Sequence, residues 1–117
     1  MIEARFTSDE KQKKLSLSVK GHAGYAEYGK DTICASASIL AYTVAQIISA
    51  MWRHGDLAKD PTIRLDPGDI EISCEVEKKT VYAEAVHTFF VAEVGYTLLA
   101  YNHPEYVTIS NTLGKDL

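Results

Sequence analysis

The chain has 117 residues, 46% of them hydrophobic, which predicts a single domain over residues 1–117 whose core needs no metal or disulfide. Its formal net charge of −4 argues against direct nucleic-acid binding, because phosphate binding depends on clustered Lys and Arg. The first ten residues lack a basic segment followed by a hydrophobic one, and no run of about 18 apolar residues occurs, so we expect a cytoplasmic protein with no membrane partner.

The first half of the chain predicts a hairpin followed by a helix. Residues 2–6 and 15–19 alternate apolar and polar side chains, and the polar stretch between them is typical of a hairpin connection. From Ile33 to Met51 apolar residues recur at steps of three and four, with Asp31 and Thr32 as candidate caps and Gly55 as a stop. This helix is apolar enough that we expect it to be mostly buried.

The second half predicts another hairpin, another helix and a short strand. Alternation from Ile63 to Leu65 and from Ile70 to Val76 flanks a turn over residues 66–69. A helix is expected from Thr80 to Tyr101, because apolar rows run along it and Pro104 stops it, with a short strand over residues 107–109. The order predicts an α+β fold, a largely antiparallel sheet of two hairpins plus a short strand with two long helices packed on it.

The two cysteines are expected to be free thiols. Cys34 and Cys74 are forty residues apart in different local sequences, which is unlike a disulfide framework or a four-ligand metal site. Cys74 alternates with Ile72 and Val76, so it is expected to be an inert thiol in the core. No metal or other cofactor is expected.

The segment from residue 21 to 38 places a histidine just after a strand and a cysteine just inside a helix. A thiol becomes a strong nucleophile as its thiolate, which the free N–H groups and dipole of a helix start favour. His22 can stabilise that anion and pass a proton to a leaving amine, and the N–H groups of Cys34 and Ala35 are candidate oxyanion donors. Asp31 and Ser38 flank Cys34 at helical spacing and are given supporting roles.

Each of these residues also has an ordinary structural interpretation. A lone cysteine at a helix start is most often a small buried hydrophobe, and a lone histidine after a strand is most often a bystander. Asp31 is the expected N-cap, and Ser38 is a packing residue bonded to its own helix. Tyr25 and Tyr28 either contact a partner or cover the site.

A family pattern covers the same segment. The chain resembles the Prp family of ribosomal-processing cysteine proteases, also described as YsxB-like, through Gly21-His22-Ala23, then Gly29, Asp31, Cys34-Ala35 and Ser38. The resemblance implies a Cys/His dyad of Cys34 as nucleophile and His22 as general base and acid, supported by Gly21, Asp31, Ala35 and Ser38.

The resemblance also implies a substrate and a quaternary structure. The implied activity removes a short N-terminal extension from large-subunit ribosomal protein twenty-seven, a step needed for ribosome assembly, and the implied assembly is a homodimer with a mobile loop over the site. A non-catalytic ribosome-associated module that binds the same extension is the alternative. A thiol redox protein is a weaker third hypothesis, because no second cysteine lies at Cys-x-x-Cys spacing.

Overall fold

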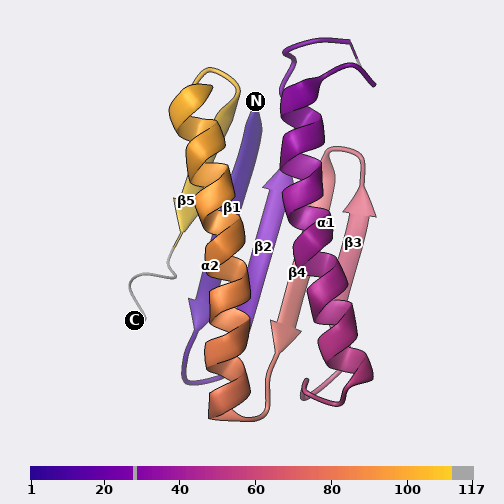
Figure 1. Cartoon of the computed structure of the whole chain (residues 1–117), viewed down its shortest axis with the longest axis vertical. Coiled ribbons are helices and arrows are strands. Elements are labelled where there is room, and N and C mark those ends of the chain that lie inside the picture. The colour runs from indigo at the N-terminus through magenta and orange to yellow at the C-terminus, as the bar shows by residue number, and fades with distance from the viewer. Residues whose placement is uncertain (28, 112–117) are drawn as a thin grey trace.

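The computed structural model of the protein describes residues 1–27 and 29–111 and contains a five-stranded sheet and two helices (Figure 1). The elements in chain order are β1 (Ile2–Asp9), β2 (Lys14–Lys20), α1 (Thr32–Arg53), β3 (Thr62–Asp66), β4 (Asp69–Glu75), α2 (Lys79–Asn102) and β5 (Val107–Asn111).

The sheet has the strand order β3-β4-β2-β1-β5. The pairs β1–β2, β2–β4 and β3–β4 are antiparallel, whereas β5 runs parallel to β1. The α+β fold with a largely antiparallel sheet is therefore confirmed, and both predicted hairpins are present. The strands of the first hairpin extend further into the polar connection than the sequence predicted, because β1 continues to Asp9 and β2 begins at Lys14.

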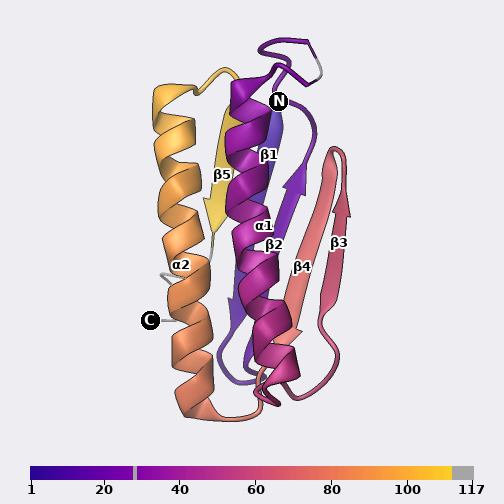
Figure 2. The same cartoon turned by 45° about the vertical axis from the view of Figure 1, so that its right-hand side comes forward.

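Alternation of side chains gives the sheet one apolar and one polar face. On β1 the residues Ile2, Ala4 and Phe6 are buried, and those between them are exposed. The buried positions of β2 and β4 point to the same side, where both helices cover the sheet as one layer (Figure 2). The core lies between these two layers, and the other face of the sheet is open to solvent.

Helix α1 is less buried than the sequence predicted. Its inward stripe consists of small and branched residues, among them Ala37, Ala41 and Ile48. Ile39 is 60% exposed and Ile47 is 40% exposed, so the expectation of a mostly buried helix is wrong. The helix packs on only one side, against β4 and α2, and its outer side is left without cover.

By length and composition alone, α1 is apolar enough to cross a membrane, and it is the one such helix in residues 1–27 and 29–111. A third of the stretch that meets this test is buried inside the protein. Its inward side belongs to the same core cluster as the sheet and α2. Core helices of soluble proteins pass the same test, so it carries little weight here.

Helix α2 also has a buried and an exposed apolar side. Phe89 and Tyr96 are fully buried, and the Tyr96 hydroxyl donates a hydrogen bond of 2.6 Å to the carbonyl oxygen of Ala37 in α1. Phe90 and Leu98 are also apolar residues of this helix, yet both are exposed on its outer side. The pattern of α2 is apolar on more sides than the sheet can cover.

Candidate active site

The candidate site lies at the end of the molecule where β2 leads through a loop, residues 21–31, into α1 (Figure 1). A cavity of about 520 Å³ opens there. It brings together all the predicted site residues: Gly21, His22, Asp31, Cys34, Ala35 and Ser38. Ile2, Val19 and Ile70 add apolar walls from three strands of the sheet.

Asp31 joins the loop to the start of α1. One carboxylate oxygen, Oδ1, accepts hydrogen bonds from the backbone N–H groups of Ile33 at 3.0 Å and Cys34 at 2.9 Å, as an N-cap does. The other oxygen, Oδ2, accepts from the N–H groups of Tyr25 at 2.9 Å and Ala26 at 3.2 Å. Asp31 therefore caps the helix and clamps the loop with one side chain.

The Asp31 side chain is a buried anion, since the residue is only 7% exposed. Burial raises the pKa of this carboxyl group, but its four backbone hydrogen bonds outweigh that effect and leave the pKa below its usual range. All four partners are backbone N–H groups, so Asp31 acts as a cap here and does not orient the His22 ring.

Cys34 is half-buried in the first turn of α1, and its sulfur accepts a hydrogen bond from the backbone N–H of Ala23 at 3.3 Å. His22 precedes Ala23, so this contact brings the histidine and the thiol into one cavity. Both residues are among those described, and no hydrogen bond joins the His22 ring to the thiol in this structure. The two candidate residues therefore share a cavity without being hydrogen-bonded to each other.

The expected pair of oxyanion donors is already in use. The N–H of Cys34 is bonded to Asp31 Oδ1, and the N–H of Ala35 is bonded to the main-chain oxygen of Asp31 at 3.0 Å. The expectation that these two groups are available to a substrate is therefore wrong for this state, because the cap that starts the helix also takes its first donors.

The imidazole of His22 rests on the turn between β3 and β4, which the sequence did not place at the site. A Cβ atom built on Gly68 would lie 2.5 Å from Nε2 of His22, so the ring occupies the space that a side chain there would fill. The N–H of Gly21 donates a hydrogen bond of 2.9 Å to the carbonyl oxygen of Gly68. Pro67 and Gly68 both line the cavity.

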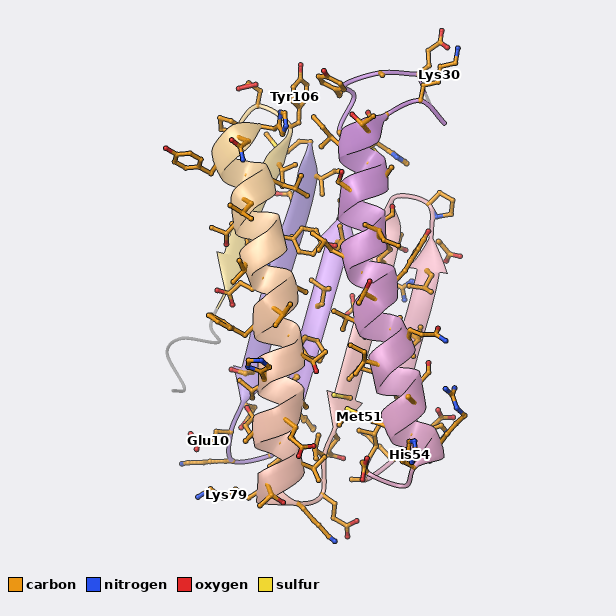
Figure 3. The ribbon with its side chains drawn as sticks, viewed as in Figure 1. Glu10, Lys30, Met51, His54, Lys79 and Tyr106 are labelled. Atoms are coloured by element: carbon orange, nitrogen blue, oxygen red, sulfur yellow. The ribbon has the colours of Figure 1, made fainter. Side chains whose placement is uncertain are left out.

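The loop is also anchored by an aromatic contact. The Tyr25 ring meets the Tyr106 ring edge-on with centroids 5.3 Å apart, and the His103 ring at 6.3 Å. Tyr106 lies at the same end of the molecule as Lys30 of the loop (Figure 3). Tyr25 therefore packs against the connection from α2 to β5, whereas Tyr28 lies outside the described residues.

A family model, described as cysteine protease Prp, matches residues 1–108. The chain belongs to this family. A search of curated proteins finds no match.

Several solved structures share the fold. One is the essential ribosomal processing protease Prp from S. aureus with a covalently linked product peptide, at 21% identity and TM-score 0.67, covering 95% of this chain and 99% of that one. The same protease with a substrate peptide has 20% identity and TM-score 0.65, with the same two coverages. SMU.848 from Streptococcus mutans has 28% identity and TM-score 0.62, covering 95% of this chain and 93% of that one.

A Prp cysteine protease needs a reachable thiol, and the two thiols of this chain differ in that respect. Cys74 points into the core, as predicted, and burial raises its pKa to about 12. Cys34 lines the cavity. In residues 1–27 and 29–111 no group of three or more His, Cys, Asp or Glu side chains is arranged to hold a metal ion.

Proposed function

We propose that the chain is a cysteine endopeptidase in which Cys34 is the nucleophile and His22 is the general base and acid. The observation that carries this proposal is the shared cavity, which is lined both by the half-buried Cys34 at the start of α1 and by His22. Membership of the Prp family supports the same reaction class.

The chemistry proceeds through two acyl transfers. The thiolate of Cys34 attacks the peptide carbonyl carbon, and the imidazolium of His22 gives its proton to the leaving amine as the carbon–nitrogen bond breaks. Water activated by His22 then attacks the thioester and releases the acid product and the thiol. The His22 ring and the Cys34 sulfur are not hydrogen-bonded at rest, so they must come closer for the proton transfer.

The proposed substrate is the N-terminal extension of large-subunit ribosomal protein twenty-seven. Removal of this extension is needed for ribosome assembly. The S. aureus structures with similar folds are described as a ribosomal processing protease with substrate and product peptides. The apolar walls formed by Ile2, Val19 and Ile70 suit an apolar peptide segment. The net charge of −4 suits the basic ribosomal protein that follows the cut.

A peptide spanning the extension and the first residues of the ribosomal protein tests this function. We expect the reduced protein to make a single cut and the Cys34→Ala variant to make none, while binding of the peptide and the melting temperature of the variant stay close to wild type. Binding without a cut by either protein would instead favour the non-catalytic ribosome-associated module.

We also propose that the protein forms a homodimer through the outer side of its helices. Ile39 and Leu98 flank a shallow groove of about 360 Å³ between α1 and α2, and Leu98 is 58% exposed. Burying such an apolar face against a second copy removes it from water. We expect the wild-type protein to have the mass of a dimer at micromolar concentration and the Leu98→Glu variant to have the mass of a monomer. Thr108→Glu, on the uncovered face of the sheet, is the control and should remain a dimer.

A cytoplasmic location without direct nucleic-acid contact follows from the proposed substrate, which is a ribosomal protein processed before or during assembly. The net negative charge supports the lack of direct nucleic-acid contact. Cell fractionation tests the cytoplasmic location. We expect the protein in the soluble fraction, and its recovery with the membranes would contradict a cytoplasmic location.

A further inference from the structure

The turn between β3 and β4 forms part of the cavity wall and touches the His22 ring. Gly68 has a backbone φ of +71°, and a Cβ atom there would come within 2.5 to 3.2 Å of three atoms of the imidazole. The ring is otherwise at the surface, since His22 is an exposed residue. The backbone of Gly68 is therefore a surface that limits where this ring can lie.

Two sets of interactions hold the turn in place. The hydrogen bond from the N–H of Gly21 to the oxygen of Gly68 fixes the turn to the residue before His22. The carboxylate of Asp69 pairs with Lys20, and Nη2 of Arg64 donates a hydrogen bond of 3.0 Å to the same oxygen, Oδ1. Lys20 is the last residue of β2, so this ion cluster ties the turn to the strand that leads into the site.

We propose that the β3–β4 turn positions the catalytic imidazole, with Gly68 as the surface on which the His22 ring rests and the Lys20–Asp69–Arg64 cluster as the support of that surface. The proposal rests on the catalytic role proposed for His22. An exposed ring just beyond the end of a strand has several rotamers open to it, and a backing surface removes some of them. Displacement of a catalytic group by about 1 Å can cost a hundredfold in rate.

Gly68→Asn tests the contact, with Gly55→Asn as its matched control. Asn is among the residues that tolerate positive φ best, so backbone strain is small in both variants. Gly55 has a similar φ of +78° at the end of α1, and a Cβ there has nothing within 4 Å. The two variants therefore differ in whether the new side chain meets the His22 ring.

Two readouts separate positioning from stability. The first is the set of His22 ring resonances in the NMR spectrum, identified by their loss in His22→Ala. The second is kcat and KM for cleavage of the extension peptide. We expect Gly68→Asn to shift the His22 resonances and to lower kcat by on the order of a hundredfold with little change in KM. Gly55→Asn should leave the His22 resonances and kcat at wild-type values.

Unmoved His22 resonances in Gly68→Asn, or a kcat equal to that of Gly55→Asn, would overturn the positioning role. If wild type itself cuts no peptide, the proposed function fails while the resonances still report whether the turn holds the ring. The two failures are therefore distinguishable.

A second variant, Asp69→Asn, keeps Gly68 and its backbone and removes the negative charge of the ion cluster. Because the cluster is exposed, its attraction is screened by salt. At low ionic strength we expect the kcat of Asp69→Asn to be severalfold lower than that of wild type. In molar salt the difference in kcat should become smaller, because salt then weakens the ion cluster of the wild type as well. An unchanged kcat at low salt would contradict the supporting role of Asp69, even if Gly68→Asn failed to fold.

Discussion

The backbone N–H of Ala23 donates a hydrogen bond to the sulfur of Cys34 over 3.3 Å. The two residues are eleven positions apart, so this bond closes the loop that separates the histidine from the cysteine. The same contact therefore holds the loop against the thiol and keeps the neighbouring His22 at the cavity.

The two thiols should react at very different rates with iodoacetamide. At pH 8 we expect the folded protein to be alkylated at Cys34 and not at Cys74, because Cys74 is buried and its pKa is raised to about 12. Peptide mapping by mass spectrometry gives the labelled site, and labelling in denaturant is the control in which both react. Equal rates at the two cysteines in the folded protein would refute the assignment.

Replacing Asp31 should destabilise the protein. Asp31→Ala removes an N-cap and leaves four backbone N–H groups at one buried point without their acceptor, at a cost of about 2 kcal/mol in the free energy of unfolding. Urea unfolding measures this loss. A variant as stable as wild type would show that water replaces the carboxylate without cost.

The contribution of Asp31 should also depend on pH. Its pKa is lower in the folded protein than its ordinary value of 3.8, so the stabilisation is present above that value and is lost as pH falls through the folded pKa. We expect the difference in unfolding free energy between wild type and Asp31→Asn to be constant near neutral pH and to shrink below pH 3.8. If the difference in unfolding free energy instead grew as the pH fell, the pKa of Asp31 would not be lowered in the folded protein.

Tyr25 should hold the loop in place. In Tyr25→Ala the contacts with Tyr106 and His103 are lost, so amide hydrogen exchange in residues 23–27 should speed up. Tyr101→Ala is the matched control, because Tyr101 is 83% exposed. Equal exchange in the two variants would mean that Asp31 alone fixes the loop.

The bond between the two helices beneath the site can be tested without creating a large cavity. Tyr96→Phe removes the hydroxyl that donates to the oxygen of Ala37 and keeps the ring that packs edge-on against Phe6. We expect a loss of about 1 kcal/mol in the free energy of unfolding. Thermal or urea unfolding measures this loss. An unchanged free energy of unfolding would show that the hydrogen bond makes no net contribution to stability.

Local patterns in the sequence predict most of the elements but not how they assemble. The alternation of Ile2, Ala4 and Phe6 identifies a strand with one buried face, and Asp31 before an apolar periodic run identifies a helix start. Nothing local indicates that β5 pairs in parallel with β1, because that pairing depends on where α2 returns the chain. The apolar excess of α2 likewise does not tell which of its sides meets the sheet.

The same division holds for the site. The short segment from Gly21 to Ser38 predicts which residues share a cavity, because a strand end and a helix start joined by a short loop must lie close together. Gly68 comes from a turn more than forty positions after His22, and its role is invisible until the sheet is assembled. The signal available in the sequence was a glycine in the predicted turn over residues 66–69, which does not show what that glycine contacts.

The most direct test of the account is the mass of the protein and of the extension peptide during turnover, in samples quenched with acid. We predict that wild type cuts the peptide once and carries a transient thioester adduct of the N-terminal product. After digestion of the quenched protein, this adduct should lie on the peptide that contains Cys34, whereas Cys34→Ala should show neither the cut nor the adduct. Cleavage by Cys34→Ala at the wild-type rate, or an adduct on a different residue, would contradict the account.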